Sequence, residues 1–203
     1  MSCEGNRMSD VRIGEALIKE VIQEELKDFP SEEIPPLNPL AIEGETVQEQ
    51  KVVNQLGTMI RIIGDKLKDN PEFQDAIDGV ARCPGSKGER FKEVADKVFQ
   101  DGITWERIVV LFYVAGKLAV KMVEVHLPQS VRDVLKWTLD FFRNNLLGWI
   151  VDHGGWINSF SELAVASVQS VSSVSSNTCG LVLIFAAGLA IGSVITWKLT
   201  RQL

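Results

Sequence analysis

The stretch that decides the fold is 105-WERIVVLFYVAGKLAVKMVEVH-126. After its first turn, the charged exceptions to an otherwise apolar surface are Lys117, Lys121 and Glu124. A helix that is apolar on nearly every side must be buried on every side, so the segment predicts a central helix with neighbours all round. Thr104 is a suitable N-cap, and we expect this central helix over residues 104–126.

A second stretch, 51-KVVNQLGTMIRIIGDKLKDN-70, is amphipathic instead. At 100° per residue its apolar side chains fall within roughly 120° of arc, which is one face of a helix. This stripe consists of Val52, Val53, Leu56, Met59, Ile60, Ile63 and Leu67. Its periodicity fits two interpretations, a surface helix packed on its own core or a helix that lies in another protein's groove.

The remainder of residues 1–162 predicts further amphipathic helices around the central one. The first helix is expected over residues 9–28, with Ser9 or Asp10 as its N-cap. Four prolines then indicate an acidic loop without regular structure over residues 29–46. Asn70 and Ser86 are suitable caps for two short helices, and Pro128 is expected to open a last helix whose apolar stripe runs to Ile150. No segment alternates with period two, so we predict an all-α domain.

The chain changes character after this domain, because no charged residue occurs from residue 163 to residue 197. Residues 163–177 are serine-rich and predict a flexible linker. Residues 178–197, TCGLVLIFAAGLAIGSVITW, would span about 30 Å as a helix, the thickness of a bilayer's hydrocarbon core. The alternative is a buried core helix, but length and the flanking positive charge favour a tail anchor. Its expected interface and packing residues are Gly188, Gly192, Ser193, Trp197 and Lys198.

Composition argues against several classes of function. The net charge of −6 gives a nucleic-acid partner no electrostatic support. Three widely spaced cysteines suit free thiols better than a disulfide framework. The two histidines have no partner at metal-ligand spacing, and phosphate-binding or nucleophile motifs are absent. Gly154-Gly155 fits a helix-breaking turn better than a phosphate cradle. We therefore predict no enzyme activity, no metal and no cofactor.

Three motifs resemble the Bcl-2 family of apoptosis regulators, and most closely its pore-forming members. LGTMIRIIGDKL at residues 56–67 is similar to a BH3 segment. DGITWERIVVLFYVAGKL at residues 101–118 resembles the family's first homology motif running into the central helix. WTLDFFRNNLLGWIVDHGGW at residues 137–156 resembles the second homology motif. Each motif alone is weak, whereas their order and spacing together are specific.

The resemblance implies a Bcl-2-like helical bundle and a set of partner-binding residues. The BH3 positions are Leu56, Ile60, Ile63, Gly64, Asp65 and Leu67. The implied groove, lined by the central helix, includes Trp105, Arg107, Val110 and Leu111. Asp65 of one molecule would pair with Arg107 of another, fixing register and partner choice. Without the resemblance, the simpler interpretation of both residues is unrelated surface charge.

Three departures from the family pattern stand out. The family's first homology motif reads Asn-Trp-Gly-Arg, whereas Glu106 replaces the glycine that lets a partner helix approach the groove. Ile60 occupies an anchor position that is usually leucine. The serine-rich linker is also longer than in the pore-forming members and lacks their proline. Glu106 leaves the strength of groove binding open.

The function implied is that of a pro-apoptotic effector, cytoplasmic at rest. On activation it would expose its BH3 helix, form homo-oligomers and permeabilise the mitochondrial outer membrane, releasing cytochrome c. Implied partners are BH3-containing and other Bcl-2-family proteins, further copies of the chain and outer-membrane lipid. Lys117 and Lys121 would face lipid headgroups or a pore, or simply extend from the surface of the fold. The alternatives are a survival member of the family that captures BH3 helices, and a tail-anchored adaptor.

Overall fold

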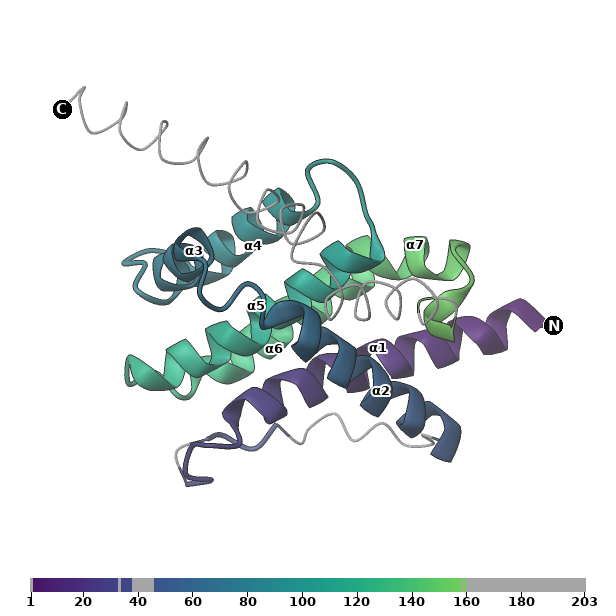
Figure 1. The fold of residues 1–203 in the computed structure, drawn as a ribbon, viewed down its shortest axis with the longest axis horizontal. Helices are drawn as coiled ribbons and strands as arrows, with labels where there is room; N and C mark the ends of the chain where they lie inside the picture. Colours follow the sequence, from purple (N-terminus) through teal and green to yellow (C-terminus); the bar gives the residue numbers. More distant parts are fainter. Residues whose placement is uncertain (1, 33, 38–45, 158, 160–203) are drawn as a thin grey trace.

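The structure is a computed structural model that describes residues 2–32, 34–37, 46–157 and 159. Every regular element in these ranges is helical, which confirms the all-α class (Figure 1). The elements in chain order are α1 (Ser2–Leu26), α2 (Val47–Gly64), α3 (Pro71–Ala81), α4 (Lys87–Val98), α5 (Trp105–Glu124), α6 (Ser130–Phe141), the π-helical turn η2 (Phe142–Leu146) and α7 (Leu147–Asp152).

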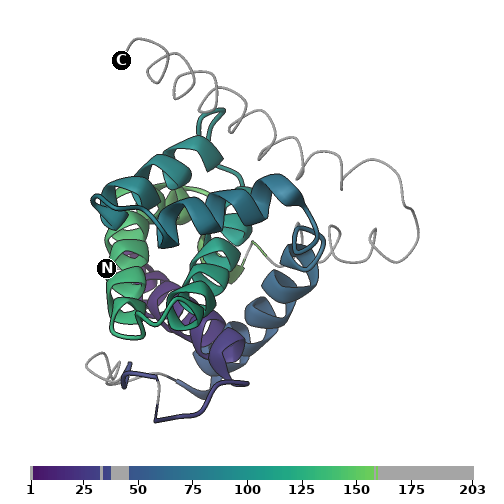
Figure 2. The same ribbon diagram turned by 90° about the vertical axis from the view of Figure 1, so that its left-hand side faces the viewer.

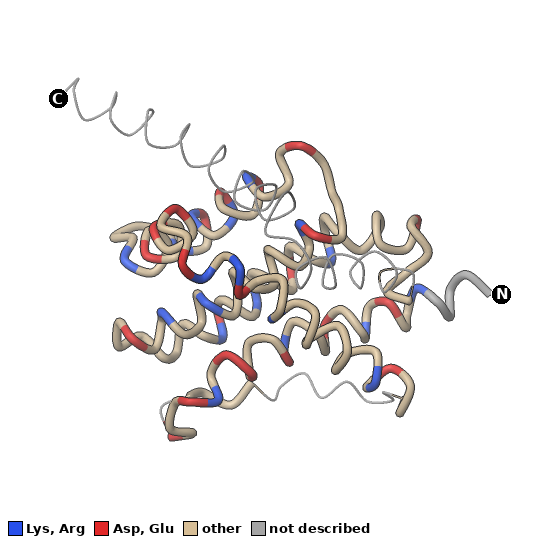
Figure 3. The backbone as a smooth tube through the Cα atoms, in the orientation of Figure 1, with Lys and Arg blue, Asp and Glu red and all other residues tan. Residues whose placement is uncertain are grey.

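Helix α5 forms the centre of the bundle, as its all-round apolar sequence predicts. Every residue from Ile108 to Gly116 is buried, and α5 packs against α1, α2, α3, α4 and α6. Figure 2 shows α5 enclosed by these helices. Acidic and basic residues are interleaved along the outer helices instead of gathering on one face (Figure 3). The core is therefore organised around one buried helix.

Helix α1 begins at Ser2, so the predicted start at Ser9 or Asp10 is wrong. Neither side chain caps α1, because both residues lie inside the helix, and each bonds to a distant partner instead. The Ser9 hydroxyl donates to Glu49, and the Asp10 carboxylate accepts from the backbone N–H of Trp156 at 3.0 Å. A short polar side chain can accept from a free amide of any helix end that the fold brings near. The sequence alone does not say which helix end that is.

Helix α2 differs in both bounds from the range 51–70 that the sequence predicts. It begins at Val47, because Thr46 and Glu49 form a reciprocal capping box that continues the helix toward the N-terminus. It ends at Gly64, after which Asp65 to Asp69 form turns. The predicted caps of the next two helices are confirmed, since Asn70 and Ser86 each accept a backbone N–H.

The chain after Pro128 forms α6, η2 and α7 in place of the single expected helix, and the second homology motif runs from within α6 to just beyond α7. A π-helical turn adds one residue to the helix and changes which side chains face the core. Its first residue, Phe142, packs where Gly14 of α1 has no side chain, and a Cβ there would lie 2.2 Å from the ring. The predicted turn at Gly154-Gly155 is confirmed by positive φ angles of 89° and 74°.

Asp10 of α1 forms hydrogen bonds with the end of this motif. The Trp156 indole also donates to the Asp10 carbonyl at 2.9 Å, and Trp156 packs in an aromatic cluster with Trp105, Phe112 and Phe142. Burial raises the pKa of the Asp10 carboxyl, and the Trp156 amide lowers it in part. Its second oxygen finds no donor among the described residues.

Parts of the chain with sequence predictions lie outside the described residues. These are the linker at 163–177, the tail anchor at 178–197 with Gly188, Gly192, Ser193, Trp197 and Lys198, and residues 38–45 of the loop. The described loop residues, 29–32 and 34–37, contain no helix or strand, and Leu37 is buried. No helix in the described ranges combines the length and apolarity needed to cross a membrane.

Candidate partner-binding site around helix α2

The apolar stripe of α2 faces the core of its own domain. The four BH3 anchors of the sequence prediction, together with Gly64, are buried, with exposed fractions of 0–2% for Leu56, Ile60, Ile63 and Leu67. The first interpretation of the stripe, a core face, is therefore what this arrangement shows. A partner could reach the stripe only after α2 leaves α1 and α5.

The N-terminal end of α2 is held to α1 by a buried ionic cluster. One oxygen of Glu49, a residue 7% exposed, accepts from Arg12 and from the Ser9 hydroxyl, each at 2.7 Å. Its other oxygen accepts from the Thr46 backbone at 2.9 Å. Burial raises the pKa of Glu49, but hydrogen bonds from Arg12, the Thr46 amide and Ser9 outweigh it and lower the pKa to about 2. The charged carboxylate is therefore the form that fits this site.

The C-terminal end of α2 is held to α5 mainly by close packing. Gly64 lies against the buried ring of Tyr113, and a Cβ on Gly64 would lie 2.2 Å from the ring. The Tyr113 hydroxyl donates to Asp65 at 3.1 Å. Burial and the negative charge of Asp65 raise the pKa of Tyr113, so the phenol stays protonated and remains a donor. The predicted Gly-Asp pair thus contacts the central helix of its own molecule.

The predicted groove residues on α5 occupy different environments. Val110 and Leu111 are fully buried, and Trp105 is 3% exposed with its ring 5.1 Å from that of Trp149. Arg107 donates to the Gly102 carbonyl at 2.7 Å and pairs with Asp101 at 3.3 Å. Arg107 and Asp65 therefore each have a separate partner within one molecule.

The two lysines predicted to share a face of α5 are both paired. Lys117 contacts Glu25 of α1 at 2.6 Å and lies 5.1 Å from the centre of the Tyr113 ring. Lys121 contacts Asp78 of α3 at 3.0 Å and Glu124 at 3.2 Å. The two lysine side chains are only 22–27% exposed, and their ion pairs connect α5 to α1 and α3 in the closed bundle.

Several residues that restrain α2 were missed by sequence reasoning. Ser9, Arg12 and Glu49 lie near the ends of predicted helices, where charged and polar residues are expected on the solvent side. The signal at Glu49 was the S/T-x-x-E spacing with Thr46, which predicts a cap but not a partner on α1. Tyr113 is hidden in an otherwise apolar run, although a buried tyrosine usually needs a partner for its hydroxyl.

Comparison with known proteins bears on what this site does. The profile of the apoptosis regulator proteins of the Bcl-2 family matches residues 60–156. Apoptosis regulator BAX of Bos taurus is 37% identical over 155 residues, which is 76% of this chain and 74% of the relative. Its Homo sapiens counterpart is 36% identical over the same coverage of this chain. The chain belongs to the Bcl-2 family.

Similarity extends to further proteins of this family. Homo sapiens Bcl-2-like protein 1 is 31% identical over 51% of this chain and 45% of the relative. Two solved structures share the fold at a TM-score of 0.59 and 22% identity. They are Trichoplax adhaerens trBcl-2L2 bound to trBak BH3, covering 75% of this chain and 98% of that one, and chicken BOK, covering 76% and 97%. The predicted family and the absence of an enzyme activity are thereby confirmed, since this is a family of non-enzymatic regulators.

Proposed function

We propose that this Bcl-2-family apoptosis regulator is a pro-apoptotic effector of the mitochondrial outer membrane. The observation that carries the proposal is the match to BAX, which covers about three quarters of both chains at 36–38% identity. On activation the protein exposes α2, forms homo-oligomers through its BH3 helix and groove, and permeabilises the membrane so that cytochrome c is released.

Release of α2 is the step on which the function depends. Each fully buried Leu or Ile side chain contributes roughly 1.5–3 kcal/mol to stability. Exposing Leu56, Ile60, Ile63 and Leu67 to water would therefore cost on the order of 10 kcal/mol, as much as the whole stability of a typical domain. The stripe leaves its core only when another apolar site accepts it, either the groove of a second molecule or lipid.

Self-association exchanges contacts that exist within one molecule for contacts between two. Asp65 is exposed and lies off the stripe, where its carboxylate accepts a hydrogen bond from the Tyr113 hydroxyl. Arg107 pairs with Asp101, whose side chain is 68% exposed. The Tyr113 contact is a single hydrogen bond, worth about 0.5–1.5 kcal/mol, and the pair of Arg107 with Asp101 is weakened by solvent at Asp101 although Arg107 itself is only 14% exposed. Asp65 of one molecule therefore pairs with Arg107 of the next at little cost, and this pair sets the register of the oligomer.

The rest of the mechanism concerns the membrane. Opening of the bundle separates Lys117 from Glu25 and Lys121 from Asp78, and both lysines then face lipid headgroups or a water-lined pore. A bare charge in the hydrocarbon core would be costly, which favours this placement. The protein is cytoplasmic at rest, and the predicted span at residues 178–197 anchors it in the outer mitochondrial membrane on activation.

A liposome experiment tests this function. The purified full chain, added with a BH3 peptide to vesicles of outer-membrane lipid composition, should release an entrapped dye. Asp65→Ala should lower the rate of release, because it removes the pair with Arg107 without touching the stripe. Asp69→Ala is the matched control, since it removes the same charge four residues away. Absence of release by the unaltered chain would refute the effector function.

A survival role in the same family is the second candidate, favoured by the match to Bcl-2-like protein 1. In that role the groove captures BH3 helices and restrains an effector. The same vesicles separate the two functions when a known effector is present. Release by this chain alone with peptide supports the effector, whereas no release combined with inhibition of the known effector supports the survival role.

A further inference from the structure

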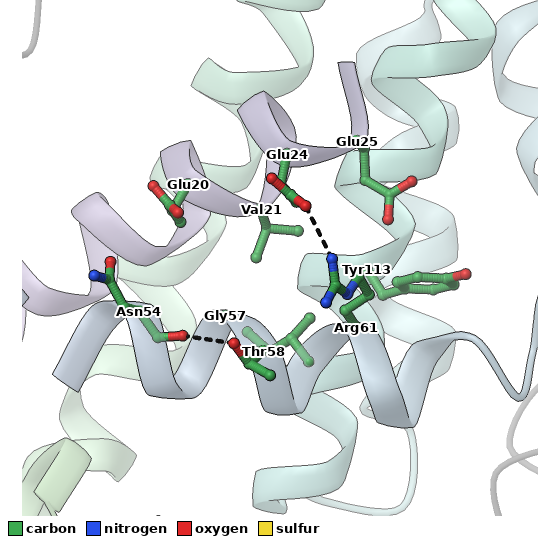
Figure 4. A pocket seen from close by; sticks show the side chains of 10 residues that line it. Glu20, Val21, Glu24, Glu25, Asn54, Gly57, Thr58, Arg61 and Tyr113 are labelled. Carbon is green, nitrogen blue, oxygen red and sulfur yellow. Dashed lines mark hydrogen bonds and ion pairs between the residues drawn. The ribbon is translucent and has the colours of Figure 1, made fainter. Parts of the chain in front are cut away.

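A cavity of about 230 Å³ lies between α1 and α2 (Figure 4). We propose that it binds a small organic cation, a primary ammonium or guanidinium group carried on a short apolar stem. Such a ligand contacts both helices and holds α2 in its closed position. Only this regulatory consequence rests on the proposed function, because binding itself depends on the cavity alone.

The floor of the cavity is apolar and preformed. It is made by Val21 of α1, Ile60 of α2 and the ring of Tyr113, all of which belong to the buried core. Gly57 leaves the α2 wall open, since a Cβ there would meet the Glu20 side chain at 3.6 Å, an ordinary contact distance. The space beside Gly57 therefore has room for about one methyl group of a ligand without a clash.

The charges on the rim select a single positive charge. Three carboxylates line the cavity, and two of them already have cations. Glu24 pairs with Arg61 at 2.9 Å and with Lys27 at 2.6 Å, and Glu25 pairs with Lys117 at 2.6 Å. Among the described residues, no cation or hydrogen-bond donor pairs with Glu20. A ligand cation would complete the pairing at Glu20.

The size of the cavity limits the ligand to a fragment. Most small-molecule sites occupy roughly 300–1,000 Å³, so this cavity holds one ring or a short chain and not a drug-sized molecule. Glu20 is partly exposed, so solvent screens its ion pair, which adds on the order of 1 kcal/mol. Most of the affinity comes from burying the apolar stem, and we expect a Kd on the order of millimolar. Phenethylammonium has the required size, ring and charge.

Occupancy of this cavity favours the closed bundle over the open one. The ligand touches Glu20 and Val21 on α1 and Gly57 and Ile60 on α2, and these walls exist together only while α2 lies on α1. A ligand that binds one state alone shifts the equilibrium by a factor of 1 + [L]/Kd. At ten times its Kd, phenethylammonium should therefore reduce the open population about tenfold.

Binding is tested by NMR titration of the ¹⁵N-labelled full chain with phenethylammonium chloride. The amide resonances of Gly57 and Thr58 should shift and saturate. The uncharged analogue 2-phenylethanol should bind more weakly, and Glu20→Gln should weaken phenethylammonium binding about fivefold, as expected for loss of one partly exposed ion pair. Gly57→Leu should abolish binding by filling the cavity.

Gly79→Leu is the matched control for the last variant. Gly79 is also inside a helix, and nothing lies within 4 Å of an added Cβ there. Both variants replace a helical glycine by leucine, but only Gly57→Leu should lose the ligand. A circular-dichroism melt shows whether each variant is folded. Saturable shifts that survive Gly57→Leu, equal affinity in Glu20→Gln, or no shift at Gly57 and Thr58 would overturn the site.

The regulatory consequence is read from the liposome assay. Phenethylammonium should raise the BH3-peptide concentration needed for half-maximal dye release by the unaltered chain, and should not do so for Gly57→Leu. Binding without this effect would refute the restraint on α2. If the chain releases no dye even without the cation, the effector function fails while the NMR result still decides the binding site.

Discussion

The two ends of helix α2 are held in chemically different ways. At the N-terminal end, the buried carboxylate of Glu49 accepts hydrogen bonds from Arg12 and Ser9 of α1. At the C-terminal end, Gly64 packs on the Tyr113 ring of α5, and the neutral hydroxyl of Tyr113 donates to Asp65. The first contact depends on charge state and the second on shape. A change of pH should therefore loosen one end while leaving the other in place.

Substitution of Gly64 should have the largest effect on stability, because it disturbs the close packing at the C-terminal end of α2. In Gly64→Ala the new methyl group would lie 2.2 Å from a carbon of the buried Tyr113 ring, so the ring or the end of α2 would have to shift. Overpacking of this kind typically costs about 1–3 kcal/mol, and we expect a value near 3. Thermal and urea unfolding would measure it.

Gly79→Ala is the control for this variant, since its added Cβ meets nothing within 4 Å. It should be neutral or stabilise the fold by up to about 1 kcal/mol through helix propensity. Equal stability of the two alanine variants would show that close packing does not hold the C-terminal end of α2.

Substitution of Glu49 tests the charge-dependent contact at the N-terminal end of α2. The pKa of Glu49 is about 2 in the folded protein against 4.5 for the free side chain, so the ionised form stabilises the fold above pH 4.5. This contribution is lost as the pH falls from 4.5 toward 2, when the unfolded chain binds the proton first. Allowing for partial solvent screening, Glu49→Gln should cost about 2 kcal/mol at pH 7 and nearly nothing at pH 2.

Urea unfolding of both proteins at several pH values would measure the difference. A double-mutant cycle with Arg12→Gln shows whether the loss comes from the Glu49–Arg12 pair, because the two single losses should not add if the residues act as a pair. A Glu49→Gln penalty that stays constant from pH 7 to pH 2 would contradict the charge-based contact.

Removal of the Tyr113 hydroxyl should have a smaller effect on stability, because it deletes one hydrogen bond at the C-terminal end of α2 and keeps the packing there. Tyr113→Phe keeps the ring against Gly64 and deletes only the bond to Asp65, so we expect a loss of about 1 kcal/mol. Urea unfolding would measure this loss. In an Asp65→Ala background the substitution should have little further effect. An undiminished loss there would mean that the hydroxyl does not act through Asp65.

The smallest effect is expected at the middle of α2. Arg61 pairs with Glu24 of α1 at 2.9 Å, but their side chains are 47% and 40% exposed. Solvent screens such pairs, so Arg61→Ala should change the free energy of unfolding by less than about 0.5 kcal/mol. Any loss should disappear in 1 M salt, where charges are screened within about 3 Å. A loss as large as that of Glu49→Gln would show that burial does not explain the difference in strength between the two ion pairs.

Several features of this chain follow from local patterns that the sequence displays directly. The all-round apolar run after Trp105 predicts the central helix, and the period of Leu56, Ile60, Ile63 and Leu67 predicts a buried face on α2. Short polar residues before helices predicted the caps at Asn70 and Ser86. The order of three motifs predicted the family. These signals need only neighbours within one or two turns of a helix.

The predictions that failed depend on neighbours far away in the chain. Ser9 and Asp10 resemble the start of a helix, but Asp10 bonds to a residue 146 positions later. The continuous apolar spacing after Pro128 does not reveal the π-helical turn, which forms where Phe142 meets Gly14. A polar side chain satisfies whichever group the fold brings near, and local periodicity does not identify that group.

Sequence by itself therefore determined the helical class, the central helix, the apolar face of α2 and membership of the Bcl-2 family. Only the tertiary structure decided how that face is restrained, through Glu49 with Arg12 at one end and Tyr113 with Gly64 and Asp65 at the other. The reason is physical. Helix formation and amphipathicity depend on residues three or four positions apart, whereas a buried charge or a missing Cβ acquires its meaning from the partner packed against it.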